Sequence, residues 1–185
     1  QNFIINLGKT LNKEEYEQVS ENVWIAKDAN IYESACIKGP TIIDKGAELR
    51  HCAFIRGKAI VGKNAVVGNS TELKNAILFD NVQVAHYNYV GDSILGYKAH
   101  LGAGTKAANI KADKKDVVIK NGKEQIETNL RKVGAMIGDY SEVGCNSVLN
   151  PGTIIGKNTN IYPLTFVRGF VPPNSICKGN IEGNI

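Results

Sequence analysis

The strongest constraint on the fold is an aliphatic residue that recurs at every sixth position. The first uninterrupted series is Ile25, Ile31, Ile37, Ile43, Leu49, Ile55, Val61, Val67 and Leu73. A period of six fits neither an α-helix nor a plain strand. It is the period of a solenoid in which each hexapeptide forms one short strand and a turn. The position four residues after most of these aliphatics is small or hydroxylated, so we expect both positions to point inward.

Three such hexapeptides would form one triangular coil, and stacked coils would pair their strands in parallel. Columns of aliphatic side chains would then run inside a prism. Burying each of them is worth roughly 1.5 to 3 kcal/mol before conformational entropy is subtracted. The repeats therefore predict an all-β fold, a parallel β-helix. The usual rule for parallel strands favours right-handed crossovers, and the period alone does not overrule it.

The repeat slips by one residue twice and breaks once. It resumes at Leu78 after Leu73, and at Leu95 after Val90, so the two slips flank His86. We expect them to re-aim side chains around that histidine. The aliphatic series stops after Leu101 and returns in strict register at Ile137, Val143, Leu149, Ile155, Ile161 and Val167.

Residues 107–136 interrupt the two blocks and are predicted to be a loop that carries an extruded β-hairpin. Within them, 116–119 and 123–126 flank Asn121-Gly122, a strong hairpin signal. Residues 106–132 hold eight Lys or Arg against four Asp or Glu. Two interpretations are open: a solvated loop, or a segment whose cations meet the phosphates of a ligand that it covers.

The pattern divides the chain into a short N-terminal helix or linker at 1–22, a β-helix domain at 23–172 and a tail at 173–185. The segment 11–20 is rich in Glu, Lys and Gln, which predicts that the helix or linker lies there. Pro172-Pro173 is expected to end the coils and leave a short cap or frayed end. A chain of 185 residues suffices for one such domain with a substantial core.

Composition argues against several classes of partner. The net charge is only +4, and no basic cluster is interleaved with aromatics, so no nucleic-acid partner is expected. No apolar run is long enough to span a bilayer, and the N-terminus lacks the zones of a signal peptide, so we expect no membrane partner and a cytoplasmic location. The cysteines lack a Cys-x-x-Cys spacing, which predicts reduced, mostly packed thiols and no structural zinc.

Side chains suited to chemistry concentrate between residues 84 and 109. This stretch reads Val-Ala-His-Tyr-Asn-Tyr-Val-Gly-Asp at 84–92 and His-Leu-Gly-Ala-Gly-Thr at 100–105. Arg56 and Lys74 precede it and lie eighteen residues, or one coil, apart. They should share a face of the prism about 4.8 Å apart along its axis. That spacing suits the binding of a phosphate, although two solvated cations on a face of the prism would show the same sequence pattern.

Together with the hexads, these motifs resemble the left-handed β-helix domain of sugar-1-phosphate nucleotidyltransferase and acetyltransferase enzymes. That family includes the bifunctional bacterial enzyme that makes UDP-N-acetylglucosamine. The resemblance covers about residues 23–172. It implies left-handed coils, a homotrimer, and transfer of an acetyl group from acetyl-CoA to the amine of an amino-sugar phosphate such as glucosamine 1-phosphate. The glycine-rich, lysine-containing signature of the nucleotidyltransferase domain has no match in the 185 residues.

The resemblance also implies roles for individual residues. It makes His86 the general base. The side chains implied to bind the sugar phosphate are Arg56, Lys74, Tyr89 and His100. The residues implied to hold the acyl donor are Asn109, Gly102, Gly104 and Cys145. Two departures concern substrate recognition, because His100 replaces an asparagine and the Asn-Tyr-Asp-Gly run of the bacterial relative reads Asn-Ile-Lys-Ala at 109–112.

The chemistry of acyl transfer accounts for a histidine. An amine attacks a thioester only when it is unprotonated, and its remaining proton must leave, so a base that titrates near neutrality is suited to the task. His51 lacks the surrounding motif and is expected to be a surface residue. The alternative function is a non-catalytic, trimerising or regulatory β-helix module associated with a sugar nucleotidyltransferase. The replaced Asn-Tyr-Asp-Gly run motivates that alternative.

Overall fold

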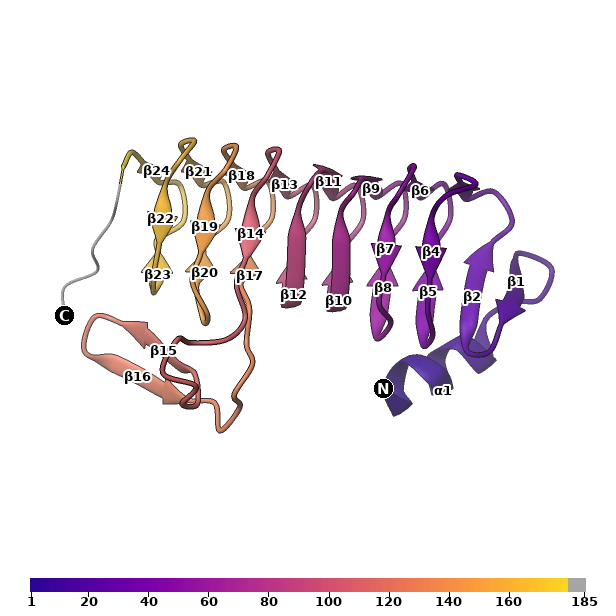
Figure 1. Cartoon of the computed structure of the whole chain (residues 1–185), viewed down its shortest axis with the longest axis horizontal. Helices are drawn as coiled ribbons and strands as arrows, with labels where there is room; N and C mark the ends of the chain where they lie inside the picture. The colour runs from indigo at the N-terminus through magenta and orange to yellow at the C-terminus, as the bar shows by residue number, and fades with distance from the viewer. Residues whose placement is uncertain (180–185) are drawn as a thin grey trace.

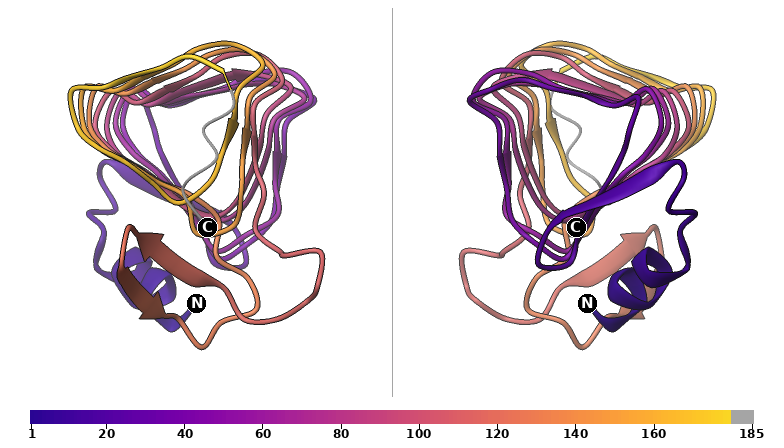
Figure 2. Two further views of the ribbon diagram at one scale, coloured as in Figure 1. Left: turned by 90° about the vertical axis from the view of Figure 1, so that its left-hand side faces the viewer. Right: turned by 90° about the vertical axis from the view of Figure 1, so that its right-hand side faces the viewer.

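The computed structural model of the chain describes residues 1–179, which form a prism of stacked triangular coils (Figures 1 and 2). The strands of successive coils pair in parallel and line three faces. The fold class predicted from the sequence, a left-handed parallel β-helix of hexapeptide repeats with a short N-terminal helix and an extruded hairpin, is confirmed.

Each face is a parallel ladder of short strands. Face 1 consists of β2 (Val23–Ala26), β5 (Thr41–Ile43), β8 (Ala59–Val61), the second halves of β10 (Glu72–Leu78) and β12 (Tyr89–Leu95), β17 (Met136–Ile137), β20 (Ile154–Ile155) and β23 (Phe170–Val171). Face 2 consists of β3 (Asn30–Ile31), β6 (Glu48–Leu49), β9 (Val66–Asn69), β11 (Gln83–His86), β13 (His100–Leu101), β18 (Glu142–Val143), β21 (Asn160–Ile161) and β24 (Ile176–Cys177). Face 3 consists of β4 (Cys36–Ile37), β7 (Phe54–Ile55), the first halves of β10 and β12, β14 (Lys106–Ala107), β19 (Val148–Leu149) and β22 (Phe166–Val167).

The hexad positions form the core, as predicted. Most of the recurring aliphatics are almost completely buried in one continuous cluster, and only those of the first coil are partly exposed. The small positions are also buried, and several of their hydroxyls donate to backbone carbonyls of the next coil. Thr71, for example, donates to the Val84 carbonyl at 3.0 Å, and Ser141 to the Gly156 carbonyl at 2.8 Å. A hydroxyl can therefore replace a methyl group inside the prism without leaving an unsatisfied polar atom.

Both one-residue slips lie inside the two longest strands of the solenoid. β10 and β12 each run without interruption across the corner from face 3 to face 1, and Leu73 and Leu78 stand opposite Val90 and Leu95. Because the two slips coincide on adjacent coils, the ladder between them stays in register. The slips are therefore at the opposite end of face 3 from His86, rather than around it as expected.

The insertion leaves the prism later than the aliphatic pattern suggested. Lys106–Ala107 is a paired strand, and Ala107 is a buried hexad position occupied by a small residue. The segment between β14 and β17 carries the predicted hairpin, formed by β15 (Val118–Asn121) and β16 (Glu124–Glu127). Gly122 takes the first central turn position with a φ of +57°, as a type II′ turn requires. In Figure 1 the hairpin lies beneath the C-terminal coils.

The N-terminal helix is displaced from its predicted position. Residues 11–20 form a turn followed by β1 (Tyr16–Ser20), which pairs antiparallel to β2, whereas α1 spans Asn2–Thr10. The side chain of Ile4 packs with Trp24 and Ile42 on the outer surface of face 1. The burial of this apolar side of α1 against face 1 determines where the helix forms. The polar composition of 11–20 gave no indication of that position.

The C-terminal coils continue past Pro172-Pro173, which were expected to end them. These prolines occupy a corner between β23 and β24, and Pro173 packs against Gly156 of the preceding coil. Only the first part of the predicted 173–185 tail lies within the described residues, since 180–185 lie outside them.

The thiols are less buried than predicted. Cys36, Cys52 and Cys145 are exposed at strand ends and corners, and only Cys177 is packed in the core. Burial raises the pKa of the Cys177 thiol. Within residues 1–179, no helix has the length and apolar character needed to cross a membrane.

The docking of α1 depends on Gly8, because a Cβ there would lie 2.3 Å from the Trp24 ring. Gly8→Ala is expected to push the helix away and destabilise the fold by about 1–3 kcal/mol, despite the better helix propensity of alanine. Trp24 is the only tryptophan, so its emission should shift to the red. The exposed Lys9→Ala is the control. Unchanged emission and melting temperature in Gly8→Ala would contradict this packing.

Candidate functional site

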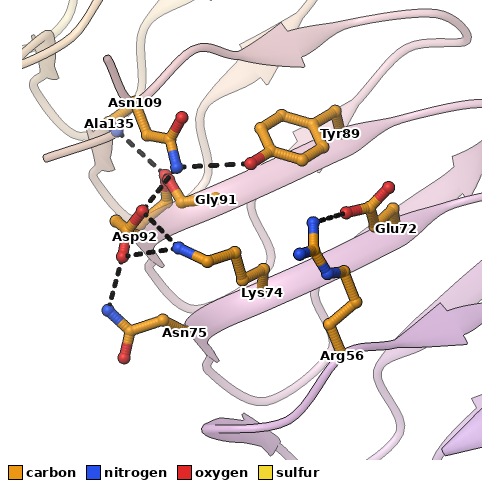
Figure 3. A network of polar contacts seen from close by, with 10 residues as sticks. Arg56, Glu72, Lys74, Asn75, Tyr89, Gly91, Asp92, Asn109 and Ala135 are labelled. Atoms are coloured by element: carbon orange, nitrogen blue, oxygen red, sulfur yellow. Dashed lines mark hydrogen bonds and ion pairs between the residues drawn. The ribbon is translucent and has the colours of Figure 1, made fainter. Parts of the chain in front are cut away.

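Arg56 and Lys74 lie side by side on the outer surface of face 3 (Figure 3). Ile55 and Leu73 are directly opposite in β7 and β10, and the Arg56 amide donates to the Leu73 carbonyl at 2.8 Å. The two cations therefore stand on neighbouring coils, as the sequence spacing predicted. Their separation along the axis is about 4.8 Å at the level of the backbone.

Each of these cations is already paired with a carboxylate. Arg56 Nη1 lies 2.8 Å from Glu72 Oε1, and Lys74 Nζ lies 3.1 Å from Asp92 Oδ2. The hydrogen bond to Glu72 raises the pKa of the Arg56 guanidinium. The four side chains bring two positive and two negative charges to one face. A phosphate bound there must share the cations with these carboxylates.

Asp92 receives three donors at the corner between face 3 and face 1. Its Oδ1 accepts from the Asn75 amide at 2.7 Å, and its Oδ2 accepts from the Asn109 amide and from Lys74. The Asp92 side chain is only 11% exposed, compared with 33% for Glu72. Asp92 is therefore the most enclosed charged group of this surface network.

Asn109 links Tyr89 to the same network, and both side chains lie above Gly91. The Asn109 amide donates to the Tyr89 hydroxyl at 3.2 Å. A Cβ on Gly91 would lie 2.6 Å from that hydroxyl and 2.7 Å from the Asn109 amide nitrogen. Gly91 is thus required because the tyrosine ring and the asparagine occupy the space above it.

The two ends of the insertion are fixed beside this network. The Val133 amide donates to the Asn109 carbonyl at 3.0 Å, and the Gly134 amide donates to the Asp92 carbonyl at 2.8 Å. The Ala135 amide donates to Ser93 Oγ at 2.9 Å. Further out, Val117 and Ile119 are buried, and both lie near Gly152 at a corner of the C-terminal coils. Whether cations of the insertion meet a phosphate remains a prediction.

His86 lies at the other edge of face 3, on the corner with face 2. Its ring is exposed and makes no hydrogen bond within residues 1–179, while its backbone carbonyl accepts from the Gly104 amide at 3.0 Å. The exposed Cys145 lies one coil beyond Gly102, and its amide nitrogen would be 2.7 Å from a Cβ placed on that glycine. His86, Gly102, Gly104 and Cys145 therefore share one edge of the prism.

The predicted residues fall into three places. Arg56, Lys74, Tyr89 and Asn109 come together on face 3. Tyr89 and Asp92 are three residues apart in one strand, so the His86 edge and the Asp92 corner are separated by roughly 10 Å or more. His100 lies apart from both, on face 2, where its Nδ1 is 2.6 Å from Glu142 Oε2. Within one chain, His100 therefore contacts Glu142 and is not part of the cluster on face 3.

Sequence reasoning missed Glu72, Asn75 and Asp92 as members of the cluster. The sequence signal was their place in the pattern, because Asn75 and Asp92 occupy the two slips of the hexad repeat. Both adopt a positive φ, +50° and +49°, as non-glycine residues do at many corners of this prism. His51, expected to be a surface residue, is exposed and contacts Ser34 Oγ at 2.9 Å.

Residues 37–124 match the family model described as the GMPPB C-terminal domain. The chain is 38% identical over 175 residues to a bifunctional protein GlmU from Methanococcus aeolicus, covering 85% of this chain and 42% of the relative. It is 34% identical over 157 residues to a bifunctional sugar-1-phosphate nucleotidylyltransferase/acetyltransferase from Sulfurisphaera tokodaii, covering 75% of this chain and 39% of the relative. The chain thus spans about two fifths of the length of these relatives.

Among solved structures, a hexapeptide transferase family protein from Anaplasma phagocytophilum superposes with a TM-score of 0.57 and 18% identity. That match covers 75% of this chain and 73% of the other. The fold thus defines a hexapeptide-repeat β-helix protein. The sequence comparisons confirm the more particular resemblance, to the β-helix region of GlmU-type sugar-1-phosphate nucleotidyltransferase/acetyltransferase proteins.

The two ion pairs should differ in their contribution to stability. The Arg56–Glu72 pair is 46% and 33% exposed, so solvent screens it and Arg56→Met should leave the free energy of unfolding nearly unchanged. The Lys74–Asp92 pair is 26% and 11% exposed, and Lys74→Met leaves an enclosed carboxylate without its cation. A loss of about 1–2 kcal/mol is expected. Urea denaturation of both variants measures the difference, and equal losses would contradict the account.

Proposed function

We propose that the chain is an acetyl-CoA-dependent N-acyltransferase that acts on an amino-sugar phosphate such as glucosamine 1-phosphate. The observation that carries the proposal is the cluster on face 3, where Arg56, Lys74, Tyr89 and Asn109 lie next to one another and His86 stands at the edge of the same face. The name of the Sulfurisphaera tokodaii relative, a bifunctional sugar-1-phosphate nucleotidylyltransferase/acetyltransferase, supports the same reaction class.

The charge pattern of the cluster supports the substrate class. Two cations and two carboxylates alternate on the surface of face 3. An amino-sugar phosphate carries both a phosphate and an ammonium group before reaction. Such a zwitterion complements the pattern, whereas a plain sugar phosphate brings only negative charge to a surface whose cations are already paired.

In the proposed reaction, a ring nitrogen of His86 accepts a proton as the substrate amine attacks the thioester carbonyl of acetyl-CoA. A carbon–nitrogen bond forms, the carbon–sulfur bond breaks, and the proton is passed to the leaving thiolate. The exposure of His86 leaves its ring accessible to an amine. Backbone N–H groups of the Gly102–Gly104 corner are candidates for contact with the acyl donor. Cys145, with no histidine bonded to it in residues 1–179, is proposed as a contact residue rather than a nucleophile.

The activity test is thiol release from acetyl-CoA in the presence of glucosamine 1-phosphate. His86→Ala should lower kcat by about 10²- to 10⁴-fold and leave the KM values largely unchanged. His51→Ala, an exposed histidine away from the cluster, should have full activity. Glucose 1-phosphate should inhibit only weakly. Absence of turnover with glucosamine 1-phosphate and a panel of amino sugars would favour the non-catalytic module.

We further propose that the protein is a homotrimer in which a neighbouring copy completes the site. On the outer surface of face 1, Ile94 and Met136 are opposite one another and are 40% and 38% exposed, an apolar stripe suited to contact with another chain. Light scattering should therefore give the mass of three chains of 20.0 kDa each. A monomer at micromolar concentration would contradict the assembly and leave the site without a second wall.

A further inference from the structure

We propose that Asp92 is a positioning residue that holds both Lys74 and Asn109, and so couples the sugar-phosphate side of the site to its acyl-donor side. This inference rests on the proposed function. Asp92 had no role in the sequence-based assignment. Its position at the second slip of the repeat places it between these two side chains (Figure 3).

Each carboxylate oxygen of Asp92 has two donors, and Lys74 reaches both oxygens. Oδ1 accepts from Asn75 Nδ2 at 2.7 Å, and Lys74 Nζ lies 3.4 Å from Oδ1 and 3.1 Å from Oδ2. Oδ2 also accepts from Asn109 Nδ2. All the partners are donors, and an ionised carboxylate is the side chain that offers acceptors on both atoms. An asparagine at position 92 would turn a donor toward one of them.

Asp92 also determines which way the Asn109 amide points. A carboxylate only accepts, so the Asn109 NH₂ group must face Asp92, and its other hydrogen is directed to the Tyr89 hydroxyl at 3.2 Å. The Asn109 Oδ1 atom makes no hydrogen bond within residues 1–179, and no fully buried side-chain oxygen there lacks a partner. The acceptor is therefore not fully buried, although Asn109 as a whole is only 8% exposed, and it is free to accept from an amide N–H of an acyl donor.

The backbone reinforces this arrangement. The Asp92 carbonyl accepts from the Gly134 amide at 2.8 Å, which fixes the returning end of the insertion, while the outgoing end carries Asn109. Asp92 adopts a φ of +49°, so its side chain projects from a constrained corner rather than from a flexible strand end. A change of its carboxylate should therefore disturb Lys74 and Asn109 without unfolding the coil.

The experiment compares KM for each substrate in four variants of the whole chain. Asp92→Asn should raise KM for glucosamine 1-phosphate and for acetyl-CoA by about tenfold each. Lys74→Met should raise mainly the former, and Asn109→Ala mainly the latter. In the Lys74→Met background, Asp92→Asn should add little to the KM for glucosamine 1-phosphate, because its effect acts through that lysine.

Asp80→Asn is the matched control. Asp80 is also a half-buried corner aspartate, but it accepts from the Lys63 backbone amide at 2.9 Å and lies at another edge of the prism. It should leave both KM values unchanged even if it lowers the melting temperature. Calorimetric titration with acetyl-CoA and with inorganic phosphate provides a second readout. Asp92→Asn should weaken both.

Three results would overturn the proposal. Asp92→Asn could lower only the melting temperature, it could leave both KM values unchanged, or it could tighten phosphate binding by releasing Lys74. If the wild type transfers acetyl groups while Asp92→Asn behaves in one of these ways, the role of Asp92 fails and the proposed function stands. If the wild type neither turns over nor binds the two ligands, both proposals fail.

Discussion

The stacking of inward aliphatic columns under a parallel backbone ladder is the interaction on which the rest of the structure depends. Each coil contributes only strands of a few residues, so no single face would be stable without the coils above and below it. The column fixes the register, and the register decides which outward side chains meet. Arg56 lies beside Lys74 for this reason, and two residues eighteen positions apart behave as neighbours.

Within this regular frame, a network of polar and charged side chains lies where the repeat departs from its six-residue period. The slips in β10 and β12 shorten one corner on two adjacent coils and place Asn75 next to Asp92. The insertion begins one coil later, so its first residues deliver Asn109 to the same corner. The His86 edge and the Asp92 corner are thus separated by the width of face 3. The proposed site uses both edges, because a ligand would extend from one to the other or a neighbouring copy would cover them.

The sequence predicted those parts that depend on burial and local turn chemistry. The hexad columns, the hairpin around Gly122 and the adjacency of Arg56 and Lys74 follow from periodicity and spacing alone. The position of α1 could not be predicted in this way, because the helix is stabilised by its contact with Trp24 rather than by a distinctive composition of its own. Ala107 was missed because a small residue fills a hexad position there. The carboxylate partners were missed because the hexad pattern fixes only the inward positions, whereas the outward side chains that meet at the slips depend on the coil-on-coil register.

The central claim is that one ligand site extends along face 3 from the His86 edge to the Asp92 corner. The most direct measurement is a crystal structure of the protein with glucosamine 1-phosphate and CoA. We expect the phosphate against Arg56 and Lys74, the amine toward His86, and the CoA chain in contact with Asn109. Both ligands bound on face 2, around His100 and Glu142, would contradict it, as would a phosphate held only by lysines of the insertion.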